Sequence, residues 1–288
     1  MKPILPFVET MIVQACNLSC EGCTNYSDLI HSGYVTWEEG KENLEQWLER
    51  IDIPDFGIMG GEPLINPQVR DWLIGVRELM PNSQIRLTTN GLLLERHWDI
   101  IQLMHDLGNT LFKITVHTPD QLNTVVQKVY DSYDWHPVTE FGIDRHATTN
   151  NFRFQVNRPS SFLKTFKGEY RNMAPCNSNP VEAFSSCIQQ TCPLLYNGRI
   201  YKCSTSGLLE DTLKRFNYPN YSEWKDYIPK GIAPDSKQED IIAFIKNFGR
   251  PDGICAQCPT SKNTELLLSH LDTVTFKSSK KLALTNTP

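Results

Sequence analysis

The sequence predicts an α/β fold, with a full or partial barrel of parallel strands followed by a small cysteine-rich region. Strand-like and helix-like patterns alternate along the first half of the chain, as they do in β–α–β crossover units. Three of the nine cysteines lie within the first 23 residues, and the other six lie after residue 175. We therefore expect a barrel at residues 1–165 and an extension at residues 166–288.

The first units of the barrel follow one another closely. A strand is expected at Phe7–Gln14, ending at the first cysteines. Thr36–Glu39 has the pattern of a capping box, which opens an amphipathic helix reaching Ile51. A second strand is expected at Phe56–Met59 and a second helix at Pro67–Met80, where Pro81 ends the pattern.

The same unit repeats further along the chain. Its strands and helices are expected, in order, at Gln84–Thr89, Leu92–Leu107, Leu111–His117, Asp120–Tyr133 and Asn151–Asn157, with an ambiguous stretch at Val138–Asp144. In parallel barrels, catalytic residues gather at the carboxyl ends of the strands. Those ends carry, in this sequence, the first cysteine group, Gly60-Gly61-Glu62-Pro63, Thr89-Asn90, His117 and Arg158.

Composition excludes several classes of protein. The 288 residues are 40% hydrophobic and 21% charged, which is enough apolar material for a core and argues against disorder. No apolar run is long enough to span a membrane, and the net charge of −5 without a basic block does not indicate a nucleic-acid groove. An odd cysteine count without a secretion signal favours a reducing, cytoplasmic location.

The first cysteine group, Cys16, Cys20 and Cys23, has the spacing C-x3-C-x2-C. Buried structural thiols have no reason to gather within eight residues of a loop. Closed zinc sites take four ligands, and no fourth His or Cys is spaced nearby. Three thiolates suit a 4Fe–4S cluster that leaves one iron without a protein ligand.

This triplet after the first strand, with Gly-Gly-Glu-Pro after the second, resembles the radical S-adenosylmethionine (radical SAM) enzymes over roughly residues 7–160. The resemblance implies a partial (β/α)6 TIM-like barrel in which SAM chelates the open iron. The reduced cluster then cleaves SAM to methionine and a 5′-deoxyadenosyl radical, which abstracts a hydrogen from the substrate. Cys16, Cys20 and Cys23 are thus both metal ligands and catalytic residues.

The resemblance also implies contacts to SAM. Gly60 and Gly61 would let the backbone approach the ligand, and Glu62 or the adjacent carbonyls would accept from its ammonium group. Candidates for ribose or carboxylate contacts are Asn90 or Thr88, His117 or Thr115, and Arg158. Most of the family has an aromatic residue before the third cysteine. Here that residue is Gly22, and Tyr26 is the candidate to replace it beside the adenine.

A second constellation lies in the extension. Cys192 to Cys203 is predicted to form a β-hairpin around Asn197-Gly198, which would place the two cysteines opposite each other. Cys255 and Cys258 add a C-x2-C pair. Four such thiolates suit either zinc or a 4Fe–4S cluster, and their spacing does not decide between them.

The spacing Cys187-x10-Gly198-x4-Cys203 resembles the SPASM and twitch extensions of radical SAM enzymes. Because no cysteine follows Cys258, the resemblance is closer to twitch, which implies one auxiliary 4Fe–4S cluster. Its ligands would be Cys203, Cys255, Cys258 and one of two others. The family pattern favours Cys187 and the hairpin favours Cys192. Cys176 is left as a structural thiol or one near the substrate.

The sequence thus predicts an enzyme with two clusters. Its substrate would be a small molecule or a peptide, and its electrons would come from a flavodoxin- or ferredoxin-type donor. A closed four-cysteine site favours electron transfer as the role of the auxiliary cluster. The rival hypothesis is a zinc-stabilised binding or scaffold protein without catalysis, which explains the extension but gives the first cysteine group no role.

Overall fold

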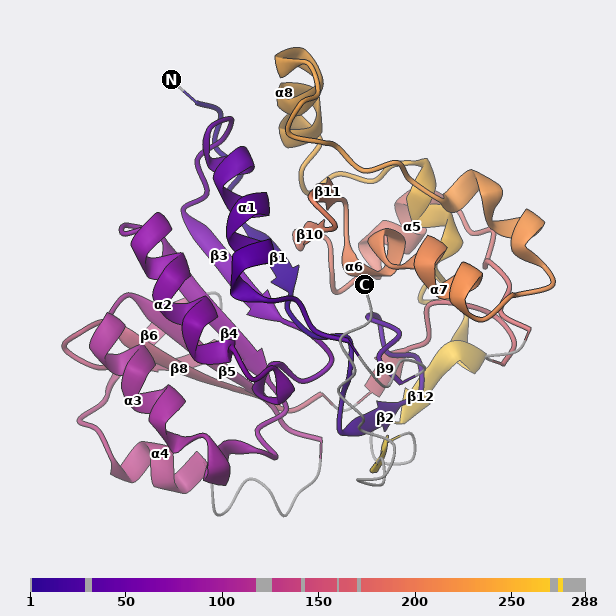
Figure 1. Cartoon of the computed structure of the whole chain (residues 1–288). Coiled ribbons are helices and arrows are strands. Elements are labelled where there is room, and N and C mark those ends of the chain that lie inside the picture. Colours follow the sequence, from indigo (N-terminus) through magenta and orange to yellow (C-terminus); the bar gives the residue numbers. More distant parts are fainter. Residues whose placement is uncertain are drawn as a thin grey trace.

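The computed structural model describes residues 2–28, 33–117, 126–140, 143–159, 161–169, 172–269 and 274–276 (Figure 1). Within this part of the chain, the main sheet has nine strands in the order β11-β10-β1-β3-β4-β5-β8-β7-β6. Their bounds are Val8–Met11 (β1), Asp55–Met59 (β3), Gln84–Thr89 (β4), Thr110–Thr115 (β5), His136–Glu140 (β6), Ile143–Ala147 (β7), Phe152–Asn157 (β8), Leu194–Tyr196 (β10) and Arg199–Tyr201 (β11).

The central strands of this sheet, from β10 to β8, all run parallel to their neighbours. Figure 1 shows three helices in a row on one face of it, α1 (Trp37–Leu48), α2 (Val69–Leu79) and α3 (Trp98–Leu107). A continuous apolar core fills the space between these helices and the sheet. The predicted α/β class and its partial-barrel arrangement are confirmed.

The capping box at the start of α1 is present. Thr36 Oγ1 accepts from the Glu39 amide at 3.3 Å, and Glu39 Oε2 accepts from the Thr36 amide at 2.8 Å. The helix then packs closely on α2, because a β-carbon at Gly40 would lie only 1.9 Å from the Trp72 ring. Small residues at this crossing therefore set how near the two helices approach.

Several expected elements differ in extent. The helix predicted at Leu92–Leu107 begins only at Trp98, after a 3₁₀ turn at Leu94–Arg96. The ambiguous stretch before β8 forms the antiparallel hairpin β6–β7 instead of a crossover unit. The first half of the helix expected at Asp120–Tyr133 lies outside the described residues, and α4 covers Gln127–Asp131.

The predicted hairpin in the extension is confirmed as β10–β11. Asn197 and Gly198 have φ angles of 48° and 72°, which is the left-handed pair that a type I′ turn requires. Strand β10 pairs in parallel with β1, so part of the extension continues the barrel sheet. The division at residue 165 stays a prediction.

The rest of the extension consists of short elements, several of them around a second apolar core, whereas the helix at 238–246 packs on the first core through Ile241. They are α5 (Pro180–Ser185), α6 (Ser204–Gly207), α7 (Leu209–Arg215), α8 (Gln238–Lys246) and 3₁₀ helices at Tyr221–Tyr227, Gly253–Gln257 and Thr264–Leu266. Two small antiparallel pairs join β9 (Ser161–Leu163) to β12 (Leu267–Ser269), and β2 (Leu18–Cys20) to β13 (Val274–Phe276). None of the described helices is long and apolar enough to cross a membrane.

Candidate active site

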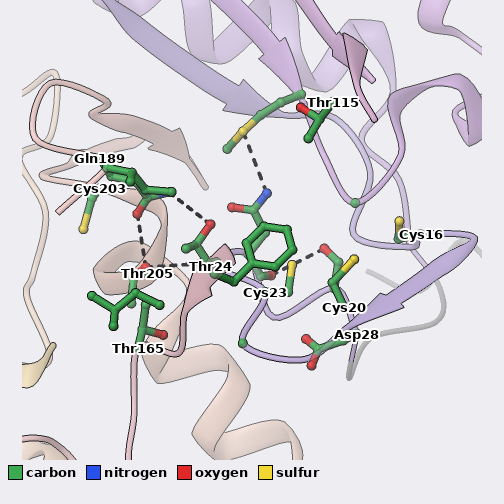
Figure 2. Close-up of a pocket in the computed structure, with 18 of the residues that line it drawn as sticks. Cys16, Cys20, Cys23, Thr24, Asp28, Thr115, Thr165, Gln189, Cys203 and Thr205 are labelled. Atoms are coloured by element: carbon green, nitrogen blue, oxygen red, sulfur yellow. Dashed lines mark hydrogen bonds between the residues drawn. The ribbon is translucent and has the colours of Figure 1, made fainter. Parts of the chain in front are cut away.

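A cavity of about 280 Å³ lies at the carboxyl ends of the parallel strands (Figure 2). Both cysteine groups contribute to its wall. The predicted site residues that line it are Cys16, Cys20, Cys23, Gly60, Gly61, Asn90, His117, Cys187, Cys203 and Cys258. The candidates Thr88 and Thr115 line it as well. The structure therefore brings most of the predicted residues together.

The first cysteine group lies in a loop that turns back after β1. The Cys20 carbonyl accepts from the Cys23 amide at 3.1 Å, and Gly22 between them has a φ of 76°. A β-carbon at Gly22 would lie 3.0 Å from the Lys164 backbone. The turn and the neighbouring segment thus both require glycine at this position, where most of the family has an aromatic residue.

Gly60 and Gly61 line the cavity, but the structure gives a further reason for them. A β-carbon would lie 2.5 Å from the Val13 carbonyl at Gly60 and 2.3 Å from the Ala15 carbonyl at Gly61. The Gly61 amide donates to Val13 at 2.8 Å, and the Glu62 amide donates to Ala15 at 2.9 Å. These glycines therefore hold the cysteine loop against the end of β3, besides exposing backbone to a ligand.

Glu62 is not among the cavity-lining residues. Its side chain is fully buried, and its carboxylate accepts from Thr89 Oγ1 at 2.6 Å, the Asn90 amide at 2.8 Å and the Leu64 amide at 3.0 Å. Burial raises its pKa to about 7, and these three donors oppose the rise. This carboxylate joins the ends of β3 and β4, and the contact of SAM with the adjacent backbone carbonyls stays a prediction.

Asn90 and His117 both reach the first cysteine group. Asn90 Nδ2 donates to Asn17 Oδ1 at 2.7 Å and lies 3.8 Å from Cys16 Sγ. His117 Nδ1 lies 3.9 Å from Cys20 Sγ. Each side chain is thus placed beside one of the three thiols. Arg158, in contrast, is exposed and is not among the cavity-lining residues.

Tyr26 does not line the cavity either. Its ring is buried in the second core, and its hydroxyl donates to the Thr205 carbonyl at 3.3 Å. The backbone has a φ of 51° at this residue, and the hydroxyl lies near Cys203 and Cys258 of the extension. An aromatic residue that the sequence did not indicate, Phe162 on β9, lines the cavity instead and stacks on His117 with ring centroids 6.1 Å apart.

The extension cysteines divide into a group of four and two others. Burial raises the pKa of Cys187, Cys203, Cys255 and Cys258, and nearby thiols, which for Cys258 include Cys176, raise it further. Mutual repulsion of this kind requires the four sulfurs to lie near one another. A bound cationic metal centre would relieve it by stabilising the thiolates.

Cys192 lies beside β1, and Cys187 is among the groups that raise the pKa of its thiol. Its neighbour Pro193 accepts from the Glu9 amide at 3.0 Å, which holds the segment along β1. Burial raises the pKa of the Cys192 thiol to about 12, with a further contribution from Glu9, while Lys113 opposes the rise. Strand pairing in the hairpin begins at Leu194, so the placement of Cys192 opposite Cys203 stays a prediction.

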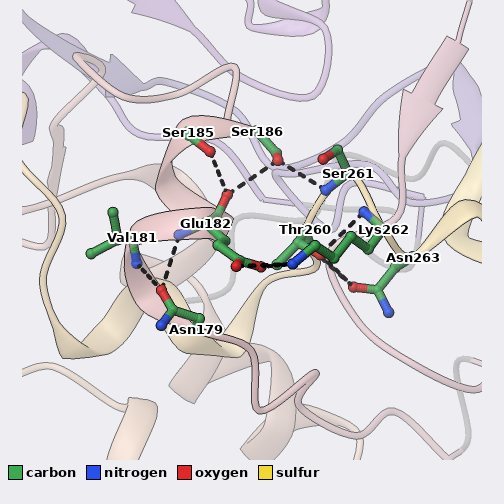
Figure 3. A network of polar contacts seen from close by, with 9 residues as sticks. All are labelled: Asn179, Val181, Glu182, Ser185, Ser186, Thr260, Ser261, Lys262 and Asn263. Atoms are coloured by element: carbon green, nitrogen blue, oxygen red, sulfur yellow. Dashed lines mark hydrogen bonds and ion pairs between the residues drawn. The ribbon is translucent and has the colours of Figure 1, made fainter.

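A network of polar contacts holds α5, which leads to Cys187, against the segment that follows Cys258 (Figure 3). Lys262 Nζ lies 2.9 Å from the Glu182 carboxylate, and Ser186 Oγ accepts from the Ser261 amide at 2.9 Å. Asn179 caps the helix by accepting from the Val181 amide at 3.0 Å. We call these contacts the α5 strap. They fix Cys187 relative to the C-x2-C pair.

The donor set fits iron–sulfur clusters. Both groups supply thiols, the ligand type of 4Fe–4S clusters, with three in one loop and four in the extension. Among the described residues, no three His, Cys, Asp or Glu side chains lie close enough to hold a single metal ion. A cluster spans a wider set of sulfurs than one ion does.

A parallel α/β barrel with a three-thiol loop and a glycine turn at its strand ends defines a class of site, and comparison with known proteins identifies that class. Residues 10–141 match the family model of the Radical SAM superfamily. The match identifies this part of the chain as a Radical SAM domain.

Similar proteins include two GTP 3′,8-cyclases. The one from Microcystis aeruginosa is 23% identical over 130 residues, covering 42% of this chain and 38% of that protein. The one from Rhodopirellula baltica is 32% identical over 89 residues, covering 30% of this chain and 25% of that protein. The chain thus spans about two fifths or less of the length of these curated relatives.

A solved structure shares the fold over most of the chain. It is the crystal structure of BtrN in complex with AdoMet and 2-DOIA, with a TM-score of 0.51 and 15% identity, and the match covers 91% of this chain and 95% of that one. At this identity, the likeness concerns the fold. It extends through the extension as well as the barrel.

Proposed function

We propose that this protein cleaves SAM reductively at a 4Fe–4S cluster held by Cys16, Cys20 and Cys23, and removes a hydrogen atom from a substrate in the same cavity. The observation that carries the proposal is that the three thiols line one cavity at the strand ends, beside the glycine turn. When bound, the cluster and SAM supply the 5′-deoxyadenosyl radical.

The chain's own residues position these groups. Asn90 stands beside Cys16 and is fixed by its own contacts, since its Oδ1 accepts from the Leu92 amide at 3.0 Å. His117 stands beside Cys20, where Phe162 supports its ring. Thr88 and Thr115 present hydroxyls from β4 and β5 on the cavity side of the sheet. These groups suit the polar ribose and amino-acid parts of SAM.

We assign an auxiliary 4Fe–4S cluster to Cys187, Cys203, Cys255 and Cys258. The cavity lining, which includes Cys187, Cys203 and Cys258 but not Cys192, and the α5 strap support this choice over a set with Cys192. Four thiols close the coordination sphere, which suits electron transfer. A flavodoxin- or ferredoxin-type protein would supply the electrons.

The cavity wall indicates the class of substrate. Hydroxyl side chains from both halves of the chain line it, namely Thr24, Ser161, Ser186 and Thr205. Such groups form hydrogen bonds with a polar molecule that carries hydroxyl or amino groups. We therefore favour a small polar molecule over a peptide. The solved neighbour of this fold holds AdoMet and 2-DOIA together.

Anaerobic purification and iron analysis test the proposal. A chain with two 4Fe–4S clusters should contain about eight irons. Under reducing conditions, the protein should convert SAM to 5′-deoxyadenosine. Replacing Cys16, Cys20 and Cys23 together by alanine should abolish this cleavage and leave about four irons in the extension. Cys176→Ala, which removes a buried thiol that belongs to neither proposed ligand set, is the matched control and should keep both properties.

Two outcomes would contradict the proposal. Zinc in place of iron, without SAM binding, would favour the zinc-stabilised scaffold. SAM cleavage that survived the triple substitution would show that the radical site lies elsewhere in the chain.

A further inference from the structure

One side chain, Gln189, connects the two cysteine groups across the cavity wall. Its Nε2 donates to Thr24 Oγ1 at 3.2 Å and to Ser204 Oγ at 2.5 Å, and its Oε1 accepts from Thr205 Oγ1 at 3.1 Å. Figure 2 shows Thr24 between the loop of Cys23 and the pair formed by Gln189 and Thr205. The amide thus uses both of its N–H donors and its oxygen in joining three segments.

Each of those segments leads directly to a cysteine of the site. Thr24 follows Cys23, and Ser204 follows Cys203. The backbone amide of Gln189 itself donates to Cys187 Sγ at 3.2 Å. A continuous route of covalent and hydrogen bonds therefore runs from Cys23 through Thr24, the Gln189 amide and Ser204 to Cys203.

We propose that Gln189 is a positioning residue that couples the two sites, holding them at a fixed separation and providing the bonded route by which an electron passes between them. This inference rests on the proposed function. The step moves one electron from the extension cluster, which is oxidised, to the SAM-site cluster, which is reduced. No bond or proton changes with it.

The geometry explains why glutamine suits this position. Only an amide offers two donors and an acceptor in one plane at the end of a flexible arm of this length. A second link joins helix α6 to the same loop, because Thr205 Oγ1 lies 3.3 Å from the Thr24 carbonyl. This link is weaker, since it consists of one long hydrogen bond. Loss of the Gln189 amide should therefore weaken the connection without removing it.

The test compares Gln189→Met with Gln190→Met. Methionine keeps the length of the side chain and removes all three hydrogen bonds of the Gln189 amide. Gln190 is the matched control because its amide donates only to the carbonyls of Phe184 and Ser185, at 2.8 and 3.5 Å. Both variants should keep the iron content of the wild type.

Each protein is reduced at both clusters, freed of excess reductant and mixed anaerobically with SAM. Rapid-freeze electron paramagnetic resonance then follows the two cluster signals, and 5′-deoxyadenosine is counted. In the wild type, the paramagnetic signal of the extension cluster should decay as a second equivalent of 5′-deoxyadenosine forms. In Gln189→Met, the first equivalent should form at the wild-type rate and the second about tenfold more slowly, which is the size of effect expected of one coupling contact.

Equal rates for the second equivalent in Gln189→Met and the wild type would overturn the inference, as would an extension signal that persists in the wild type after SAM is cleaved. Failure of the wild type to bind two clusters or to cleave SAM would instead contradict the proposed function. A weaker spin–spin interaction between the two reduced clusters in Gln189→Met, but not in Gln190→Met, would support the positioning role independently of activity.

Discussion

The two cysteine groups are built in different ways. Cys16, Cys20 and Cys23 lie within eight residues of one loop, which the backbone of Val13 and Ala15 holds against the glycine turn. The extension group assembles from three segments, with Cys187 after α5, Cys203 after β11, and a pair near residue 256. The first site is a local structure and the second is a tertiary one.

This difference decides what can be changed at each site. In the local site, close backbone contacts leave no room for a side chain at Gly60 or Gly61. In the tertiary site, side-chain contacts such as the α5 strap bring the thiols together. Substitutions outside the cysteines should therefore act on the first site through the backbone, and on the second through polar contacts between segments.

The largest expected effect separates Cys187 from Cys192. Cys187→Ser should lower the iron content from about eight to about four per chain, whereas Cys192→Ser should leave it unchanged. The reason is that Cys187 lies among the four interacting thiols and Cys192 faces Glu9 and Lys113. Iron analysis and Mössbauer spectroscopy measure the outcome. Loss of iron from the Cys192 variant alone would reverse the assignment.

The next effect concerns the anchor of the local site. Glu62→Ala leaves three buried donors without their acceptor, and we expect the free energy of unfolding to fall by about 3–4 kcal/mol. Glu62→Gln keeps one acceptor oxygen, so its free energy of unfolding should fall by about half as much. Urea denaturation of the apoprotein measures both. Equal stability of Glu62→Ala and the wild type would contradict the anchoring role.

Sequence reasoning predicted the local site better than the tertiary one. The strand at Gln84–Thr89, the capping box at Thr36 and the hairpin turn at Asn197-Gly198 follow short-range rules, and the structure confirms all three. The same reasoning did not predict that the Tyr26 ring and the Glu62 carboxylate would be buried. Their directions depend on a positive φ and on donors from another strand, neither of which is encoded by spacing.

The tertiary features had no signal in the sequence. The pairing of β10 with β1 joins segments more than 180 residues apart, and a pattern of residues does not state which edge a strand will join. Gln189 and Phe162 line the cavity for the same reason, since long-range packing places them there. Spacing alone left the choice between Cys187 and Cys192 open.

A third prediction concerns the interior of the barrel, where Glu9 lies near Lys113 and Arg86. Burial raises the pKa of Glu9 to about 7, and Lys113 and Arg86 oppose the rise. A raised carboxyl pKa stabilises the fold at low pH, and this stability is lost as the pH rises through the folded-state pKa. We expect this carboxyl to lower the free energy of unfolding by about 2 kcal/mol between pH 5 and pH 7.

Glu9→Gln should remove this contribution, because an amide does not titrate. Glu49→Gln, at an exposed glutamate on the end of α1, is the control and should keep the wild-type slope. Urea titrations of the apoprotein at several pH values measure the difference. A slope unchanged in Glu9→Gln would show that the buried carboxyl does not titrate in this range.

The smallest effect tests the α5 strap. The pair of Lys262 and Glu182 is largely exposed, with 76% and 47% of the two side chains accessible, so Lys262→Met should cost less than about 1 kcal/mol. The extension should keep its iron, because the bond from the Ser261 amide to Ser186 remains. Loss of iron in this variant would mean that one exposed ion pair controls the tertiary site.

The most direct test of the account is the coordination of SAM to the iron site of the N-terminal cysteines. Electron–nuclear double resonance of the reduced protein, with ¹⁵N and ¹⁷O in the methionine part of SAM, detects bonds from those atoms to iron. The account predicts coupling from both the amino nitrogen and a carboxylate oxygen, lost when Cys16, Cys20 and Cys23 are replaced. A cluster at this loop with four protein ligands, and no coupling to labelled SAM, would contradict it.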